Sequence, residues 1–344
     1  MRILLAAHQS RGGIGTLSRG LAETLPSILD PEDRLDVVPG WGNRRVRESR
    51  IGRLVFEQFR LPVLARRCDL LHLCDYRPVL ASRSRFLVTI HDVSFLDNPE
   101  WYPPRVAKYK RLMLDLALAK RPAQVVCVSQ WTRERLLAMR PRTRPERVAV
   151  VPSGISQSPQ VTHHPDLERP YFLTVSTIEP RKNHLRLLAA FRQARAQGLD
   201  IVWRIVGMPG YASDAIMAEL ESEPAVELCG RVSEVEKQKL YDGALFAVTP
   251  ALAEGFGFPP LEAMVRSVPV ICSSGSALDE VVGTAAVRVD AEDENGWAEA
   301  LTSLAGDAAA RSRLSHAGSR QASLFTWERC AAGYVSVYGR ALGD

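Results

Sequence analysis

Two carboxylates lie eight residues apart around a short glycine turn, in the segment AEGFGFPPLE at 253–262. Gly255 and Gly257 let backbone N–H groups approach a ligand, and the helix expected directly after them presents its positive dipole end to an anion. Each carboxylate can accept hydrogen bonds from sugar hydroxyls. Glu254 and Glu262 therefore indicate a site for a ligand that carries hydroxyl groups. The alternative is an ordinary capped helix start, opened by prolines and favoured by the dipole.

Two adjacent cations occur in STIEPRKN at 176–183, where a strand is expected to end and a helix to begin. Arg181 offers a planar fork and Lys182 a compact charge, a combination that suits two neighbouring phosphates. Cations oppose the dipole at a helix start unless an anion binds there. The pair therefore predicts contacts to phosphate, with solvated surface charge as the alternative.

The first half of the chain contains weaker candidates. The segment RGGIG at 11–15 is expected to form a loop whose Gly13 and Gly15 bring the backbone close to a ligand. It is an incomplete dinucleotide fingerprint, and an ordinary strand-to-helix turn is the alternative. His91 ends an apolar strand, where it could bind a hydroxyl or phosphate or transfer a proton, with Asp92 orienting the ring. A structural histidine is the alternative here.

A basic and partly apolar stretch covers 44–60, with Ile51, Leu54, Val55 and Phe59 among its arginines. It is interpreted as a core helix of the first domain with outward arginines. The alternative is an amphipathic surface that touches anionic lipid headgroups.

These segments need elements that position them. Apolar, β-branched runs alternate with helical patterns along the whole chain, which is typical of parallel sheets built from βαβ units. The sequence therefore predicts an α/β protein with two doubly wound parallel sheets. The expected strands cover 2–8, 34–39, 70–74, 85–91, 124–129 and 147–151 in the first half, and 171–177, 200–206, 226–229, 245–250, 268–273 and 285–289 in the second.

Open α/β sheets bind ligands beyond the carboxyl ends of their strands, so two facing sheets would place the loops above across one cleft. Helices are expected over 183–197, directly after Gly257, and over 326–338 with one apolar side. The segment 151–170 is rich in Pro, Ser and His and predicts a linker.

Length, composition and charge limit the class of protein. The 344 residues suit two domains, and 46% hydrophobic with 24% charged residues is typical of a globular chain. No membrane-spanning run or signal peptide is found, so a cytoplasmic protein is expected. Six scattered cysteines support neither a zinc site nor a disulfide framework.

The charge is divided unevenly between the two halves. Residues 1–165 contain 27 Lys and Arg against 15 Asp and Glu, a net charge of +12, whereas the rest of the chain has −7. A basic half suits nucleic acid, an anionic membrane or a phosphorylated ligand. Because the arginines are dispersed without interleaved aromatic residues, nucleic acid is disfavoured.

With these segments in this order, the chain resembles the retaining family 4 glycosyltransferases of the two-Rossmann GT-B fold, and among them the bacterial mannosyltransferase-like enzymes. The resemblance covers nearly the whole chain. It is carried by FEQFRLP at 56–62, TIHDVS at 89–94, VCVS at 126–129, VVPSG at 150–154, TIEPRKN at 177–183, IVG at 205–207, GRV at 230–232, EGFGFPPLE at 254–262 and the Trp327 tail.

The resemblance implies sugar transfer from a nucleotide-sugar with retention at the anomeric carbon, without an obligatory metal ion or other cofactor. It implies domains at 1–165 for the acceptor and 166–325 for the donor, with a closing helix at 326–344. The implied catalytic residues are His91, Arg181, Lys182 and Glu254. The implied donor-binding residues are Gly13, Gly15, Arg181, Lys182, Gly207, Gly230, Arg231, Val232, Glu254, Gly255, Phe256, Gly257, Leu261 and Glu262.

Within that resemblance, Glu254 is expected to bind sugar hydroxyls, Glu262 the ribose, and Arg181 with Lys182 the diphosphate leaving group. Many relatives have an arginine where this chain has Thr177, so the phosphate role is assigned more firmly to Lys182 than to Arg181. GDP-mannose is the favoured donor by resemblance only.

The expected acceptor is a saccharide, polyprenyl-linked, in polysaccharide or O-antigen (lipopolysaccharide) assembly. The basic half then predicts peripheral contact with the inner face of the cell membrane. Three alternatives remain: a nonhydrolysing nucleotide-sugar epimerase, an NAD-dependent dehydrogenase that uses Asp33 or Asp36 at the ribose, and a non-catalytic lipid- or polysaccharide-binding protein.

Overall fold

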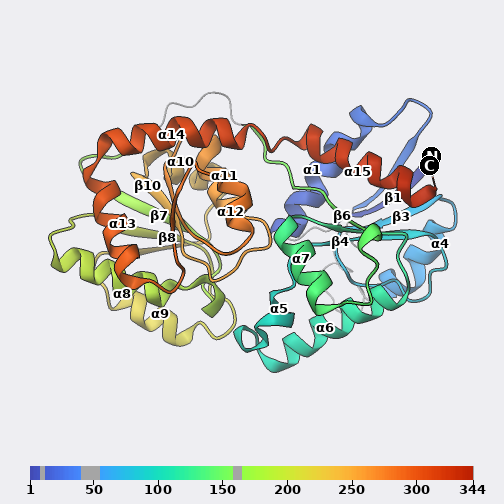
Figure 1. Ribbon diagram of the computed structural model, residues 1–344, viewed down its shortest axis with the longest axis horizontal. Helices are drawn as coiled ribbons and strands as arrows, with labels where there is room; N and C mark the ends of the chain where they lie inside the picture. Colours follow the sequence, from blue (N-terminus) through green and yellow to red (C-terminus); the bar gives the residue numbers. More distant parts are fainter. Residues whose placement is uncertain (8–11, 40–54, 158–164, 344) are drawn as a thin grey trace. The chain divides into compact units, whose positions relative to one another are not determined.

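The chain folds into two compact units, each built around one parallel sheet (Figure 1). The computed structural model describes residues 1–7, 12–39, 55–157 and 165–343. The first unit contains Met1–Glu100, Pro104–Ser156 and Phe325–Asp344, and the second contains Trp101–Pro103 and Gln157–Leu324. Apart from the short segment Trp101–Pro103, the main chain passes between units at 156–157, ahead of the boundary expected at 165, and returns at 324–325.

The first sheet has six parallel strands in the order β2-β1-β3-β4-β5-β6. Three neighbouring strands, β3, β4 and β5, are buried along their whole length, as expected for a parallel sheet covered on both faces. Its strands are β1 (Arg2–Ala7), β2 (Arg34–Pro39), β3 (Leu70–Leu73), β4 (Phe86–Ile90), β5 (Gln124–Cys127) and β6 (Val148–Val150).

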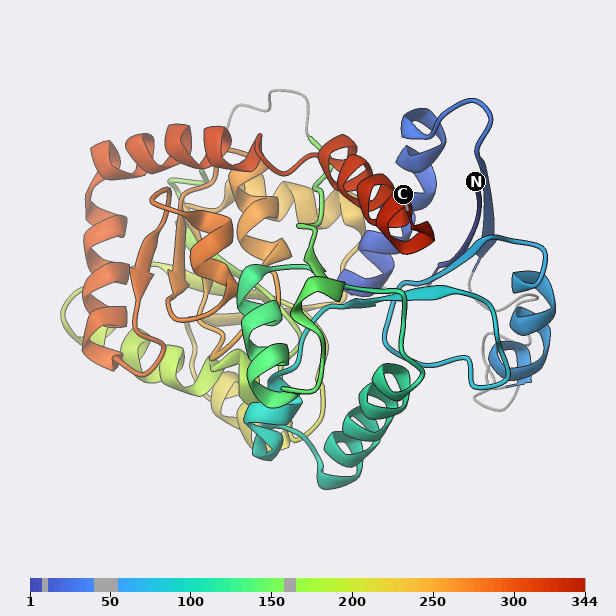
Figure 2. The ribbon, with the colours of Figure 1, turned by 45° about the vertical axis from the view of Figure 1, so that its right-hand side comes forward.

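Helices cover both faces of this sheet. In Figures 1 and 2, α1 and α15 lie above the first sheet and α6 lies below it. The helices are α1 (Gly13–Ile28), α4 (Leu61–Ala65), α5 (Ser94–Asp97), α6 (Pro104–Ala119), α7 (Gln130–Met139) and α15 (Trp327–Leu342), with a π-helical turn at Phe56–Arg60 and 3-10 turns at Pro99–Trp101 and Pro145–Arg147.

The second sheet also has six parallel strands, in the order β12-β11-β10-β7-β8-β9. Its core contains a layer of aromatic rings, in which Phe172 stacks on Trp203 and on Phe246 at centroid distances of 5.5 and 5.7 Å. The strands are β7 (Tyr171–Val175), β8 (Val202–Val206), β9 (Val226–Gly230), β10 (Phe246–Thr249), β11 (Val270–Ser273) and β12 (Val287–Val289).

The helices of the second unit are α8 (His184–Ala196), α9 (Asp214–Glu221), α10 (Glu234–Gly243), α11 (Phe258–Val265), α12 (Ala277–Val282), α13 (Glu294–Gly306) and α14 (Ala308–Ala322), with a 3-10 turn at Pro180–Lys182. All twelve predicted strands are confirmed, as is the predicted α/β class. The helices expected over 183–197 and directly after Gly257 are confirmed as α8 and α11.

Strand order determines where a ligand can approach each sheet. In the second sheet the chain leaves β7 towards β8 on one side and later adds β10 on the other side, so the order reverses between β7 and β10. Such a reversal opens a crevice at the strand carboxyl ends, which is where open α/β sheets bind ligands. The equivalent position in the first sheet lies between β1 and β3.

The last helix returns to the first unit and packs on α1 through Trp327. A methyl group added at Gly20 would lie 2.4 Å from the Trp327 ring, so only glycine permits this approach. Farther along α15, the Tyr338 hydroxyl lies 2.8 Å from Nδ1 of buried His72, and the Tyr334 hydroxyl lies 2.9 Å from Thr89 Oγ1. The predicted tail helix with one apolar side is confirmed.

Among the described residues, no helix is long and apolar enough to cross a bilayer.

Candidate active site

The loops after β7 and β10 meet at the reversal point of the second sheet, and hydrogen bonds fix one loop against the other. Asn183 adopts a left-handed conformation (φ 59°) at the start of α8. Its buried amide donates to the carbonyl oxygens of Pro250 (3.1 Å) and Ala291 (2.8 Å). The backbone N–H of Leu252 donates to the Arg181 carbonyl at 2.9 Å. This turn therefore holds the two cations at a fixed place beside the β10 loop.

Glu254 joins the two predicted cations in a single ion-pair cluster. The Lys182 ammonium donates to Oε1 of Glu254. Arg181 donates through Nη1 to the Ala253 carbonyl at 2.6 Å and to Oε2 of Glu254 at 3.4 Å, and through Nη2 to Glu179 at 3.2 Å. Most Arg181 donors are thus engaged within the protein. Lys182 has three N–H donors, of which one has a partner among the described residues, so it is the better placed to bind an added anion.

The cluster is largely buried, and this burial shifts the pKa of its lysine. The side chains of Arg181, Lys182 and Glu254 are only 12–13% exposed. Burial lowers the pKa of Lys182; the Glu254 carboxylate opposes that change, and the Arg181 charge adds to it. An anion placed beside Lys182 would stabilise its ammonium form. The electrostatics therefore favour a negatively charged ligand at this position.

Gly207 has a steric role at the same edge of the sheet. A methyl group at this position would lie 1.8 Å from the carbonyl oxygen of Ser176, at the end of β7. The Gly207 N–H also donates to the Gly230 carbonyl at 2.9 Å, which joins the ends of β8 and β9. Arg231 follows as an exposed residue and Val232 is half-buried. Only glycine fits where these three strand ends approach one another.

The backbone conformation of the turn before α11 requires glycine. Gly257 caps the helix with φ of +121°, and a methyl group there would lie 2.7 Å from Cδ2 of Leu278. Gly255 precedes it, next to Phe256, whose side chain is buried. Leu261 is fully buried as well. The side chains of Phe256 and Leu261 therefore support the turn by packing. The groups of this turn that remain available to a ligand are the backbone and the glutamates.

Glu262 lies on α11 and is held by two residues of α10. Lys237 donates to Oε1 at 2.8 Å, and the Tyr241 hydroxyl lies 3.1 Å from Oε2. Burial raises the pKa of Glu262, and the Lys237 charge opposes that rise. Each carboxylate oxygen accepts one hydrogen bond from α10 and retains capacity for another. Glu262 can therefore accept hydrogen bonds from two adjacent hydroxyls without losing its protein partners.

Sequence reasoning did not identify Glu179, Lys237 or Tyr241 as site residues. Lys237 and Tyr241 are four residues apart, which places them on one face of α10, but the same spacing is common on solvated helices. What makes the pair informative is the position of Glu262 on another helix, which is a tertiary fact. Glu179 lies inside the segment at 176–183, two residues before Arg181, and this spacing was the only signal that the sequence offered.

His91 directly follows the last residue of β4 in the first unit. Its Nε2 lies 2.8 Å from the Cys74 carbonyl, so this nitrogen carries the proton and Nδ1 of the neutral ring is an acceptor. Burial lowers the pKa of His91, and the Cys74 hydrogen bond and the Asp75 and Asp92 charges oppose this.

The expectation that Asp92 orients the His91 ring needs correction. Its carboxylate accepts hydrogen bonds from the backbone N–H and the hydroxyl of Ser94, at 2.7 and 2.8 Å, and Ser94 is the first residue of α5. This local turn occupies the carboxylate because a residue two positions on is its nearest donor. The Cys74 carbonyl is the hydrogen-bond partner of the ring instead.

Two other first-unit predictions differ from the structure or fall outside it. Gly13 and Gly15 belong to the first turn of α1 and not to a loop, because the helix begins directly after Gly12. Of the basic stretch at 44–60, residues 44–54 lie outside the described residues. The rest forms the π-helical turn Phe56–Arg60, in which Phe56 is buried and Phe59 is 70% exposed.

No group of His, Cys, Asp and Glu among the described residues could hold a metal ion. All six cysteines are free thiols.

Two family models match consecutive parts of the chain. "Glycosyltransferase Family 4" matches residues 18–158, and "Glycosyl transferases group 1" matches residues 160–321. The chain belongs to glycosyltransferase family 4. Family membership makes the protein a glycosyltransferase, and it gives no support to the epimerase, dehydrogenase and binding-protein alternatives.

Curated relatives of this family 4 glycosyltransferase include O-antigen enzymes. The chain is 27% identical to O-antigen chain mannosyltransferase B of Escherichia coli, over 98% of this chain and 99% of that one. It is 28% identical to O-antigen chain mannosyltransferase RfbU of Salmonella typhimurium, over 63% of this chain and 60% of that one.

Solved structures share the fold of this glycosyltransferase. Anabaena HepE in complex with UDP-glucose matches with a TM-score of 0.75 at 16% identity, over 97% of this chain and 99% of that one. Sucrose-phosphate synthase from Thermosynechococcus elongatus matches with a TM-score of 0.74 at 19% identity, over 98% of each chain. The predicted GT-B fold is thereby confirmed.

Proposed function

We propose that this glycosyltransferase transfers mannose from GDP-mannose, with retention, to a lipid-linked saccharide acceptor in bacterial polysaccharide assembly. The observation that carries the proposal is the meeting of Lys182, Arg181 and Glu254 at the reversal point of the second sheet. The relatives named as O-antigen mannosyltransferases favour mannose and a growing saccharide. The inner face of the cell membrane is the proposed location, since the acceptor would be anchored there.

The leaving group of such a reaction is a nucleoside diphosphate, on which negative charge builds up as the sugar departs. Lys182 keeps two N–H donors for phosphate oxygens while it stays bonded to Glu254. Arg181 adds a second positive charge from a side chain already fixed by Ala253 and Glu179. We infer that these preorganised cations, and no metal ion, stabilise the departing diphosphate.

The two glutamates then divide the rest of the donor between them. Glu254 stands beside the cations and would accept hydrogen bonds from hydroxyls of the transferred sugar. Glu262 would accept from the two ribose hydroxyls through the capacity left on its two oxygens. His91 belongs to the acceptor half, and its neutral ring with an unprotonated Nδ1 can accept a proton or a hydrogen bond from a hydroxyl group.

Thermal unfolding of the purified protein with GDP, UDP, dTDP, CDP and NAD tests the donor assignment. A ligand present at 100 times its dissociation constant stabilises the folded state by about 2.7 kcal/mol. We expect stabilisation by GDP, and we expect Lys182→Ala and Glu262→Ala to abolish it. Lys239→Ala is the matched control, because Lys239 is an exposed lysine of α10 next to the site. It should preserve the shift.

Other outcomes would contradict particular parts of the proposal. Stabilisation by UDP instead of GDP would overturn the GDP-mannose donor while leaving the site assignment intact. Stabilisation by NAD alone would overturn the donor site itself. Retention is tested separately, by the anomeric configuration of the product in NMR spectra; an inverted linkage would contradict it.

A further inference from the structure

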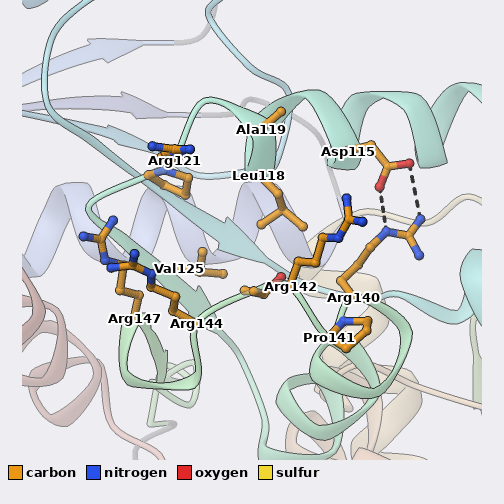
Figure 3. Close-up of a pocket in the computed structure, with 12 residues that line it drawn as sticks. Asp115, Leu118, Ala119, Arg121, Val125, Arg140, Pro141, Arg142, Arg144 and Arg147 are labelled. Atoms are coloured by element: carbon orange, nitrogen blue, oxygen red, sulfur yellow. Dashed lines mark hydrogen bonds and ion pairs between the residues drawn. The ribbon is translucent and has the colours of Figure 1, made fainter.

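A hollow in the first unit is lined by five arginines and one carboxylate. It has a volume of about 830 Å³, which is within the range of sites for small organic ligands. We refer to it as the arginine hollow, defined by Asp115, Arg121, Arg140, Arg142, Arg144 and Arg147. Figure 3 shows Arg121, Arg144 and Arg147 on one side of the view and Arg140 and Arg142 on the other, with Leu118 and Val125 between them.

Most of this positive charge lacks a counter-ion. Arg140 pairs with Asp115 through Nε at 2.6 Å and Nη2 at 3.4 Å, as the dashed lines in Figure 3 mark. None of the residues described by the structure brings a carboxylate within 4 Å of the guanidinium groups of Arg121, Arg142, Arg144 or Arg147. Like charges gathered in one hollow repel each other, and arginine forks bind phosphate oxygens in pairs. The hollow is therefore complementary to phosphate.

A second hollow continues the positive surface. It shares Arg121 and Arg147 with the arginine hollow and adds Arg83, Arg85, Lys120 and Arg340, with no acidic residue in its described lining. The Lys120 ammonium donates to carbonyl oxygens of Leu80 and Ser82, at 2.6 and 2.8 Å. Its charge is therefore not neutralised by these contacts. The positive surface extends beyond the reach of one phosphate, so it suits an array of phosphates.

The arginine hollow lies at the edge of the first sheet opposite His91. It is built where α6 ends and where β5 and β6 begin, whereas His91 follows the carboxyl end of β4. The five residues of β4 separate the two edges by about 17 Å. An anion in the hollow therefore does not belong to the site around His91.

The helix α6 connects the two edges and has an unusual outward face. It runs back from the His91 edge and ends at the hollow, over about 24 Å. In Figures 1 and 2 it lies on the outside of the first unit. Arg105, Lys108, Tyr109 and Leu112 share one helical face by their spacing, and Asp115 continues that face into the hollow.

Tyr109 and Leu112 are each 53% exposed, which combines apolar groups with cations on the same face. A free phosphate or a nucleic acid would leave these apolar groups in water. The interface of an anionic bilayer accommodates both kinds of side chain.

We propose that the outward face of α6 and the arginine hollow together dock this enzyme on anionic phospholipid. The guanidinium groups of the hollow bind headgroup phosphates, and Tyr109 with Leu112 enters the boundary of the acyl chains. Since α6 reaches from the hollow to the His91 edge, a helix lying flat on the bilayer keeps that edge near the membrane surface. The inference goes beyond the proposed donor and acceptor, and vesicle binding tests it without a sugar substrate.

Flotation of the full chain with phosphatidylcholine vesicles, with and without phosphatidylglycerol, tests the proposal. We expect binding only to the anionic vesicles, and weaker binding as salt is raised. Arg142→Gln with Arg144→Gln should lower the partition coefficient about 25-fold at low salt, since each arginine near the surface contributes about a fivefold gain. Leu112→Ser should lower it severalfold. Arg313→Gln with Arg320→Gln removes the same charge from exposed positions of α14 and should have little effect.

Several results would overturn the docking surface. They are equal binding to neutral vesicles, equal losses in the hollow and α14 double variants, or unchanged binding in the hollow variant. Binding of inorganic phosphate, measured by calorimetric titration, and binding of single-stranded RNA are tested on the same variants. If the Arg142→Gln, Arg144→Gln double variant loses either of these while it still binds vesicles, the hollow belongs to another ligand. Stabilisation by nucleoside diphosphate is measured on the same variants. It should remain, so failure of docking and failure of the donor proposal are distinguishable.

Discussion

Glu262 shows how a single side chain is prepared for a ligand by its neighbours. Burial raises the pKa of its carboxyl group, yet the proposed recognition of two ribose hydroxyls uses the ionised form. Lys237 supplies the opposing charge and Tyr241 a hydroxyl donor, so α10 determines both the protonation and the orientation of a group on α11. Lys237 and Tyr241 are therefore positioning residues of the proposed donor site.

Replacing Lys237 with Met should weaken donor binding by about 10- to 100-fold, because a charge-assisted hydrogen bond contributes about 1.5–3 kcal/mol. Tyr241→Phe should cost less, about 2- to 10-fold. Both changes should raise KM more than they lower kcat. In Lys237→Met the pKa of Glu262 rises further, so donor affinity should be lost at a higher pH than in the wild type as pH falls. Titration calorimetry with the nucleoside diphosphate over a pH series measures both effects.

Lys239→Met is the control for charge on α10, and it should bind like the wild type. A Lys237→Met variant with unchanged affinity and an unchanged pH profile would remove Lys237 from the donor site.

At the scale of elements, α15 completes the first unit although it follows the whole second unit in sequence. Trp327 approaches α1 and the 150–154 segment through Gly20 and Gly154, at distances that leave no room for a side chain. Tyr338 and Tyr334 then connect to His72 and Thr89 on neighbouring strands. The first sheet therefore depends on the last helix for one of its covering layers and for the hydrogen bonds of a buried histidine.

Gly20→Ala should destabilise the first unit by about 1–3 kcal/mol, the usual cost of overpacking a tight contact. Gly306→Ala is a matched control at the end of α13, where an added methyl group meets nothing within 4 Å. It should be neutral or slightly stabilising. Urea denaturation monitored by circular dichroism compares the two; equal midpoints would show that α15 does not need this close approach.

At the scale of the whole molecule, each unit contains a histidine that is buried in its neutral form. Burial lowers the pKa of His72 in the first unit and of His184 in the second to about 3. Unfolded chains bind a proton at both positions near pH 6.5. Because the unfolded state then holds more protons, the free energy of unfolding falls as pH decreases from about 6.5 towards 3.

Each group should lower the free energy of unfolding of its own unit by about 1.4 kcal/mol for each pH unit between about 6 and 4, or about 2.7 kcal/mol for the two units together. Urea midpoints measured between pH 7 and pH 4 test this. His72→Gln and His184→Gln should each flatten the dependence by about one proton, in the unit that holds the replaced residue. His316→Gln changes an exposed histidine and serves as the control. An unaltered slope in both buried variants would contradict the assignment.

Much of the fold was predictable from the sequence because its strands are continuous apolar runs. Such runs are buried on both faces of a parallel sheet, so their positions need no knowledge of partners. The segments at 176–183 and 253–262 were recognisable for a related reason: strand-to-helix loops in α/β proteins have strict local requirements, seen in Asn183 and Gly257 with their positive φ angles. The residues within each loop therefore determine its backbone geometry.

The remainder was decided by packing between distant segments. The sequence did not show that Lys237 and Tyr241 hold Glu262, because that contact joins two helices across 21 or more residues. The orientation of His91 was mispredicted, since the nearer Ser94 takes the carboxylate of Asp92.

The excess of positive charge in the first half was visible from composition alone. Its concentration in the arginine hollow required β5 and β6 to pair and α6 to end beside them. Sequence determines which residues are available and how the chain turns locally, whereas only tertiary structure determines which charges meet, because electrostatic contacts depend on distance in space and not on separation along the chain.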